Sequence, residues 1–347
     1  MALLFAEGFD LVDSNADLLS AAGMGPGYFT ITSFGTTDGR YGGGAPTITG
    51  TPSSYSGFPF VAARGDTVYF GFSIYPQGQY PANAAFMQIL SQQASVLLQL
   101  YLSVSGAITA EGADGTIFSP NTDVVGLTPY AWHWVEIAVT FGTNSSNGSF
   151  EIRVDGVTYL TGATMDTDAG SSHFPAEVAF SGMDQSIKID DMLIWSGSGT
   201  SPNTWIGGAR IVTLRPTADG AVVNWTASAG SDYQCVDDVA GSSDGDSTYI
   251  SSTTSAQRSR FTMDNLPNAG DTIYGVQVRL RAKKTNQSER AIQGYVRSSS
   301  SETDTSSIYL TDDYIIHRGS FITADPNGAG AWTKAAIDAI EVGVEHV

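Results

Sequence analysis

The sequence is poor in cysteine, in positive charge and in long hydrophobic runs. Its single cysteine, Cys235, has no partner within the chain, so an internal disulfide framework is excluded. Only 16 Lys and Arg stand against 35 Asp and Glu, which gives a formal net charge of −19. Without a contiguous basic stripe to replace condensed counterions, we expect no nucleic-acid partner. No run approaches the length of a transmembrane helix, and we expect no membrane insertion.

A secretory signal is also missing from the start of the chain. The N-terminal stretch contains no Lys or Arg, and the first basic residue is Arg40. A signal peptide needs a positively charged first region, so we expect a protein made and folded in a cytoplasm. Its acidic, Ser-, Thr- and Gly-rich composition is nevertheless typical of proteins that work outside cells.

Alternation of apolar and polar residues with period two is the dominant pattern, and it predicts many half-buried strands. Tight-turn dipeptides such as Asn147-Gly148 and Asp155-Gly156 separate some of them. The predicted strands are 67–75, 95–104, 134–141, 149–154, 186–195, 210–215, 221–225, 247–251, 272–282, 291–297 and 341–347. One short helix is predicted within 332–340, with Thr333 as its N-cap.

With 347 residues the chain is long enough for two domains. A segment of small residues without apolar anchors follows Trp195 and is typical of a linker. The sequence therefore predicts an all-β fold of two β-sandwich (jelly-roll) domains with one short helix near the C-terminus. The expected boundaries are a first domain at 1–197, a linker at 198–208 and a second domain at 209–347.

Three segments of the first half resemble the laminin-G/concanavalin A-like superfamily in order and spacing. They are Trp132-His133-Trp134-Val135-Glu136-Ile137, the strand 150–154 ending in Val154-Asp155-Gly156, and 189–195. The resemblance implies a jelly roll over residues 1–197 whose last strand pairs with the N-terminal one. Tryptophans are expected to fill the space between the two sheets, with Ile189, Leu193 and Trp195 facing inward.

The whole arrangement resembles minor virion proteins of tailed bacteriophages, in residues 1–5, 205–220 and 331–344. Such a protein is released by lysis, which reconciles the missing signal with the extracellular type of surface. The resemblance implies a non-enzymatic virion structural protein, displayed as a tail fibre, tail tip or other attachment component. The expected partners are further copies of the chain in a homo-oligomer (three-fold assemblies are common in phage appendages), other virion proteins and a host surface glycan. The alternatives are a capsid decoration or head-fibre protein and a free carbohydrate-binding lectin module.

Catalytic motifs are missing from the sequence. Glycoside hydrolases of this fold place two carboxylates close together, whereas Glu151 and Asp155 would stand about 13 Å apart along one strand. The four histidines have no metal-ligand spacing. The sequence therefore predicts that the protein is not an enzyme, and a glycanase with an unrecognised carboxylate pair remains the rival hypothesis.

Two sets of residues are candidates for binding. Five tyrosines in Gly- and Pro-rich, loop-like stretches are predicted to contact a glycan or a protein partner: Tyr28, Tyr41, Tyr55, Tyr80 and Tyr130. Asp190 and Asp191 offer oxygen ligands for calcium, the alternative being a surface pair beside a strand. The acidic loop 237–246 offers the same ligands, the alternative being a solvated turn. No other cofactor is predicted.

Overall fold

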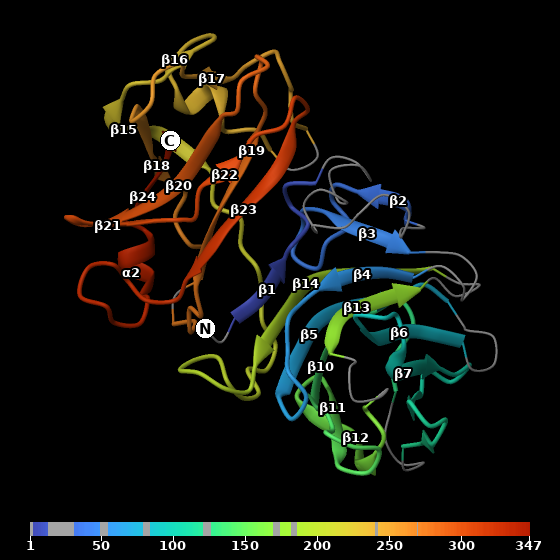
Figure 1. The fold of residues 1–347 in the computed structure, drawn as a ribbon. Coiled ribbons are helices and arrows are strands. Elements are labelled where there is room, and N and C mark those ends of the chain that lie inside the picture. The colour runs from blue at the N-terminus through green and yellow to red at the C-terminus, as the bar shows by residue number, and fades with distance from the viewer. Residues whose placement is uncertain are drawn as a thin grey trace. The chain divides into compact units, whose positions relative to one another are not determined.

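The protein is built almost entirely of antiparallel strands, as the computed structural model in Figure 1 shows. The structure describes residues 3–12, 31–48, 55–78, 84–120, 126–168, 174–181, 186–239, 242–268 and 270–347. The short helix α2 (Lys334–Ile337) lies near the C-terminus, and the predicted fold class is confirmed. The chain divides into two compact units, Met1–Ile211 and Val212–Val347. Within the described residues, no helix has the length and apolarity needed to cross a membrane.

The first unit contains two antiparallel sheets. The eight-stranded sheet has the order β12-β11-β10-β5-β14-β3-β2, and β1 also pairs with β14, as the resemblance implied. Its strands are β1 (Leu3–Glu7), β2 (Ile31–Gly35), β3 (Ala45–Ile48), β5 (Thr67–Pro76), β10 (His133–Thr140), β11 (Gly148–Val154), β12 (Val157–Met165) and β14 (Ile187–Ser196). The six-stranded sheet has the order β4-β13-β6-β7-β8-β9. Its strands are β4 (Tyr55–Pro59), β6 (Ala84–Ser91), β7 (Val96–Leu102), β8 (Ile108–Gly112), β9 (Ile117–Phe118) and β13 (Pro175–Ser181).

The core of this unit lies between the two sheets and is rich in aromatic rings. Phe70, Phe72 and Ile74 alternate along β5 and are fully buried. The Phe72 ring meets that of Phe180 on β13 edge to face, with 5.0 Å between centroids. Each buried aromatic side chain removes a large apolar area from water, so this layer supplies much of the driving force for folding.

The prediction that Leu193 and Trp195 face the core was wrong, because β14 carries a bulge. The register with β5 shifts between Asp190 and Leu193, and Asp191 has a positive φ of 51°. An extra residue in a strand reverses the alternation that follows it. Ile189 therefore faces inward as predicted, whereas Leu193 and Trp195 lie opposite Gly71 and Tyr69 on the outer face.

Trp134 lies on the same outer face, so the tryptophans do not fill the space between the sheets. Trp134 pairs across the strands with Ser73 and packs over Gly71 together with Trp195. A Cβ on Gly71 would lie 2.7 Å from the Trp134 ring and 3.0 Å from the Trp195 ring. Glycine at this position therefore leaves room for the two indoles.

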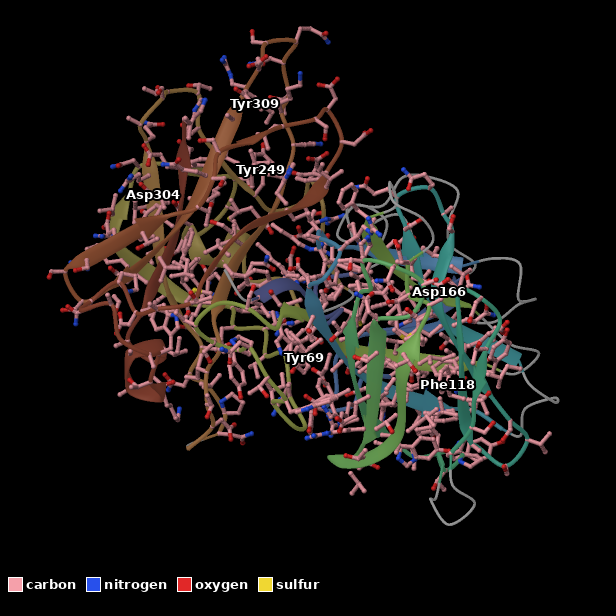
Figure 2. The ribbon with its side chains drawn as sticks, turned by 60° about the horizontal axis from the view of Figure 1, so that its bottom comes forward. Tyr69, Phe118, Asp166, Tyr249, Asp304 and Tyr309 are labelled. Atoms are coloured by element: carbon pink, nitrogen blue, oxygen red, sulfur yellow. The ribbon has the colours of Figure 1, made fainter. Side chains whose placement is uncertain are left out.

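Residues 197–211, which we call the strap, cover these indoles and are not the unanchored linker that was predicted for 198–208. The Trp195 indole donates to the Thr204 carbonyl at 3.0 Å. The Trp205 ring stacks under the Arg153 guanidinium at 3.9 Å and meets Tyr69, which is labelled in Figure 2, at 5.3 Å. The strap is anchored by the aromatic side chain of Trp205 and by backbone groups. The prediction of a linker considered only the small residues of the segment and so missed both kinds of anchor.

Buried carboxylates fasten the strap at two further points. Glu136, only 1% exposed, accepts hydrogen bonds from the backbone N–H groups of Ile206 and Gly207 at 2.9 and 3.1 Å. Asp191 accepts one from Ile211 at 2.8 Å. Charge-assisted hydrogen bonds are about twice as strong as neutral ones, so the strap is an integral part of the first unit.

The second unit contains a six-stranded sheet of order β15-β18-β24-β20-β21, in which β22 also pairs with β20, and two small sheets, β19-β23 and β16-β17. Its strands are β15 (Pro216–Val223), β16 (Thr226–Ala227), β17 (Ile250–Ser251), β18 (Arg258–Met263), β19 (Val276–Ala282), β20 (Ala291–Ser298), β21 (Ser301–Asp304), β22 (Ile308–Tyr309), β23 (Ile315–Ile322) and β24 (Glu341–His346), and a 3₁₀ turn covers Tyr233–Cys235.

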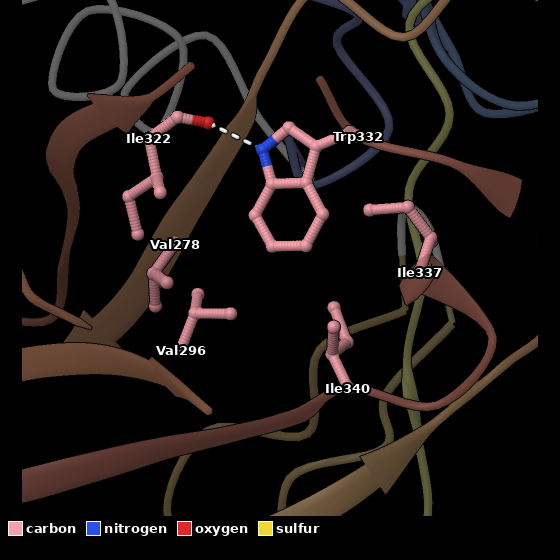
Figure 3. Packing of buried hydrophobic residues seen from close by; sticks show 6 residues of the cluster. All are labelled: Val278, Val296, Ile322, Trp332, Ile337 and Ile340. Carbon is pink, nitrogen blue, oxygen red and sulfur yellow. Dashed lines mark hydrogen bonds between the residues drawn. The ribbon is translucent and has the colours of Figure 1, made fainter. Parts of the chain in front are cut away.

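The core of the second unit gathers around Trp332, as Figure 3 shows. Its indole donates to the Ile322 carbonyl at 2.8 Å while its ring packs among aliphatic side chains. The helix α2 closes this core with Ile337, and its first turn is capped by the Thr333 hydroxyl, which accepts from the Ala336 N–H at 3.1 Å. The predicted helix and its N-cap are therefore confirmed.

A network of ion pairs crosses four strands of the second unit, and Glu302 on β21 is its central acid. Its carboxylate lies 2.8 Å from Arg260, 2.9 Å from Arg258 and 3.7 Å from Arg297. We expect Glu302→Gln to lower the free energy of unfolding of this unit by about 1 kcal/mol, because the Glu302 side chain is 32% exposed and its pairs are screened by water. Urea denaturation at low and high salt measures this. An equal loss at both salt concentrations would contradict the electrostatic explanation.

Candidate functional site

The candidate site is the outer face of the six-stranded sheet of the first unit. One row of directly opposed residues crosses five strands there, from β4 through β13, β6 and β7 to β8. The row consists of Gly57, Ala179, Gln88, Gln99 and Glu111. Opposed residues in antiparallel strands share a face, so two amides and a carboxylate follow one another across the sheet.

Side chains on β6, β7 and β8 form two hydrogen-bonded pairs along this row. The Gln88 amide donates to the Gln99 carbonyl oxygen at 2.9 Å, and the Tyr101 hydroxyl donates to the Glu111 carboxylate. On β7, Gln99 and Tyr101 alternate with the buried Leu98, Leu100 and Leu102, which fixes them on the outer side. Gln99, Tyr101 and Glu111 are half-buried, so they remain within reach of a ligand.

Glu177 on β13, two residues before Ala179, lies beside the end of the row that Gly57 forms. Its carboxylate lies over Gly57, where an added Cβ would fall 1.3 Å from Oε1. Burial raises the pKa of Glu177 above its usual range. Among the residues that the structure describes, none donates a hydrogen bond to this carboxylate. It is thus an acceptor that a ligand can use.

The row can bind but does not match a two-carboxylate hydrolase site. Glu177 and Glu111 stand on strands β13 and β8, three strand spacings apart, which corresponds to about 14 Å between backbones. Hydrolysis of a glycosidic bond by an acid and base pair uses separations below about 9.5 Å. What the row offers is amide, hydroxyl and carboxylate groups in a line, which suits a ligand rich in hydroxyl groups.

The structure describes the side chains of two of the five predicted tyrosines, Tyr41 and Tyr130. Tyr41 and Tyr130 are 52% and 67% exposed, and neither belongs to a strand of the six-stranded sheet. Tyr41 is flanked by the guanidinium groups of Arg40 and Arg210 at 4.9 and 4.5 Å. Their role in contacting a glycan or partner stays a prediction.

The other three tyrosines are only partly covered by the structure. Tyr55 is the first residue of β4, where it lies opposite Ser181. Tyr28 and Tyr80 lie outside the described residues. The signal that could have found Gln99, Tyr101 and Glu111 is their alternation with apolar residues on two adjacent strands, but the sequence does not give the register that brings them together.

Asp190 and Asp191 are buried at 5% and 2% exposure, so the alternative of a surface pair was wrong. All four carboxylate oxygens already accept hydrogen bonds from N–H or O–H groups. Asp190 accepts from the backbone of Asp191 and of Arg40, both at 2.7 Å. Asp191 accepts from the backbone of Ile211 at 2.8 Å and from the Ser73 hydroxyl at 3.3 Å.

This arrangement does not fit a calcium site as it stands, because calcium needs six to eight free oxygen ligands. Within the described part of the chain, no three His, Cys, Asp or Glu side chains gather in a way that could hold a metal ion, and this includes the described residues of the loop 237–246. The calcium prediction stays a prediction. Burial raises the pKa of Asp190 to about 8 and that of Asp191 to about 6.

His133 is used by the fold. Its Nδ1 lies 2.8 Å from the Asp155 carboxylate, while its Nε2 accepts from the Thr128 N–H at 2.9 Å. Asp155 also accepts from the Trp134 N–H at 2.9 Å. Through Nδ1 the ring holds the turn after β11, and through Nε2 it holds Thr128 in the segment before β10, as expected for a histidine that belongs to its strand.

No protein-family model matches the sequence, and no curated protein matches it. Solved structures do match. Cip1, a cellulose-induced protein, is 18% identical, with a TM-score of 0.37, and the match covers 51% of this chain and 87% of that one. The alginate lyase Aly36B is 12% identical with a TM-score of 0.35, and the match covers 56% and 95%. A Trypanosoma rangeli sialidase is 10% identical with a TM-score of 0.32, and the match covers 44% of this chain and 25% of the sialidase.

These matches correct the prediction that the protein is not an enzyme. Two of the three are named as enzymes, an alginate lyase and a sialidase. A fold does not by itself exclude catalysis. At these identities and TM-scores, the likeness assigns no reaction, substrate or residue role to this chain.

Proposed function

We propose that this chain is a glycan-binding β-sandwich protein displayed on the surface of a tailed-phage particle. The row Gln88-Gln99-Glu111, with Tyr101 and Glu177 beside it, is the observation that supports the binding role. Gln88 is only 7% exposed and holds the Gln99 amide, so the groups within reach of a ligand are the half-buried Gln99, Glu111 and their neighbours. The backbone of this face is held rigid by its ladder of strand pairs. Sites on strands are positioned more firmly than sites on loops, which favours recognition of an extended chain of sugars.

The sequence resemblance in residues 1–5, 205–220 and 331–344 supports the placement on a virion. The chain would be made in the host cytoplasm, assemble with further copies of itself and with other virion proteins, and face a host surface glycan as part of a tail fibre or tail tip. Capsid decoration or head fibre is the alternative position, and a free lectin is the alternative to a virion protein. Cryo-electron microscopy of intact particles distinguishes these, since density at the tail, over the capsid or nowhere on the particle selects one of the three.

Binding by the row is tested with Gln99→Ala. We expect this variant to bind its glycan about fivefold to tenfold more weakly, because it removes a ligand contact and leaves the Gln88 amide without its partner. Affinity for oligosaccharides found on a glycan array measures the effect. The matched control is Gln277→Ala, which removes an amide from the second unit. Equal affinities of wild type and Gln99→Ala would contradict the proposed face.

A further inference from the structure

We propose that the glycan bound by the outer face of the six-stranded sheet carries no acidic group, and that its hydroxyl or amine groups donate to Glu111 and Glu177. This inference rests on the proposed function and deepens it, since it names the chemical class of the ligand. It excludes polymers of uronic or sialic acids and sulfated or phosphorylated glycans.

Positive charge in the first unit is very scarce, and this is the first observation. Residues 1–211 contain 18 acidic residues and five basic ones, a balance of −13. The five basic residues are Arg40, Arg64, Arg153, Lys188 and Arg210. All of them lie within the described ranges, so the segments that the structure does not describe contribute no Lys or Arg to this unit.

Four of the five basic side chains are engaged on or beside the eight-stranded sheet. Arg40 donates to the Ser73 hydroxyl at 3.0 Å, and Arg153 stacks on Trp205. Lys188 on β14 pairs with Asp38 at 3.0 Å. Arg210 of the strap lies over the Tyr41 ring at 4.5 Å. These contacts occupy the cations on elements other than β4, β13, β6, β7 and β8.

The fifth cation, Arg64, lies in the connection between β4 and β5 and is also engaged. Its guanidinium forms an ion pair with Asp168 and donates to the Thr143 carbonyl. The strands of the candidate face themselves contain no Lys or Arg at all. A carboxylate or sulfate on a bound sugar would thus meet the Glu111 and Glu177 carboxylates without a free Lys or Arg of the first unit to pair with.

The electrostatic consequence is discrimination by repulsion. An anionic sugar brought onto half-buried carboxylates loses hydration and gains like-charge contacts, both of which cost free energy. A hydroxyl or an ammonium group instead donates to them, and an ammonium gains a charge-assisted hydrogen bond. Glu177 is suited to this role because its carboxylate is held over Gly57 without a donor among the described residues.

The test compares three classes of oligosaccharide on the full-length protein: neutral, amine-bearing and acidic. It is run at pH 8, where a histidine with the ordinary pKa of about 6.5 carries little charge, so that His173, which lies outside the described residues, cannot supply a cation. We expect binding of neutral or amine-bearing chains and none of acidic ones. Binding of acidic chains as tight as that of the others overturns this inference and leaves the proposed function in place. Binding of no glycan in any class overturns both.

Three variants test whether Glu177 causes the discrimination against acidic glycans. Glu177→Lys is expected to acquire affinity for acidic chains, and Glu177→Gln to lose about tenfold for the amine-bearing ones. Gly57→Ala keeps the charge but forces the carboxylate away from its place, and should weaken binding without unfolding the sheet. Glu151→Gln, on the other sheet, is the matched control. Unchanged selectivity in Glu177→Lys and Gly57→Ala, with circular dichroism showing both folded, overturns the role of Glu177.

Discussion

Replacing Trp195 with alanine is expected to lower the free energy of unfolding of the first unit by about 3–5 kcal/mol, the range found for large aromatic residues in cores. The side chain is fully buried although it lies on the outer face of its sheet. Its ring stacks on Tyr69 at 5.5 Å between centroids and packs against Gly71, while its indole N–H holds the Thr204 carbonyl of the strap. The substitution therefore opens a cavity and removes a strap anchor at once.

Urea denaturation followed by circular dichroism measures the loss, and limited proteolysis shows whether the strap is released. The matched control is Trp132→Ala, since Trp132 is only half-buried and contacts Tyr75 at 5.4 Å. We expect a much smaller loss there and cleavage within 197–211 only for the Trp195 variant. Equal losses for the two variants would mean that the strap contributes little to the stability of the first unit.

Local pattern was enough to predict the short helix and part of the strands, whereas the predicted strand 210–215 does not form and strands such as β6, β13 and β23 were not predicted. The segments 67–75 and 149–154, in which apolar and polar residues alternate, form β5 and β11. The N-cap at Thr333 could be predicted because it joins residues only three positions apart in the sequence. The pairing of β1 with β14 followed from the family resemblance. These features depend on neighbours in sequence or on a shared topology.

What could not be predicted depends on single residues that break a pattern or on contacts between distant ones. The bulge at Asp191 places Trp195 outside the core, and no local signal marks it. The strap is held by backbone N–H groups bonding to Glu136, 70 residues away from Ile206. The candidate site needed the register of β6, β7 and β8, because Gln88, Gln99 and Glu111 become neighbours only when those strands are aligned.

The stability of the first unit is expected to fall as the pH rises from about 4 to 8, and Asp190 and Asp191 are the cause. Burial raises the pKa of these carboxyls to about 8 and about 6, while in the unfolded chain an Asp has a pKa of about 3.9. The folded state then holds more protons than the unfolded state in this range, so raising the pH favours unfolding. The contribution is fully present below pH 4 and is lost as the pH passes the folded pKa values.

The urea midpoints of wild type and Asp190→Asn at pH 5 and pH 8 measure this dependence. The midpoint of the variant should change less with pH, because the substitution removes a titrating group.

The same experiment decides whether calcium binds at Asp190 and Asp191. A calcium ion would need both carboxylates ionised, so with calcium bound the stability would rise with pH, and a chelator would lower it. If a chelator leaves the midpoint at pH 8 unchanged while the wild type is more stable at pH 5, the pair is held by protons and by the N–H groups of Arg40 and Ile211. A chelator-dependent midpoint would instead establish a metal at Asp190 and Asp191 and reverse the predicted sign.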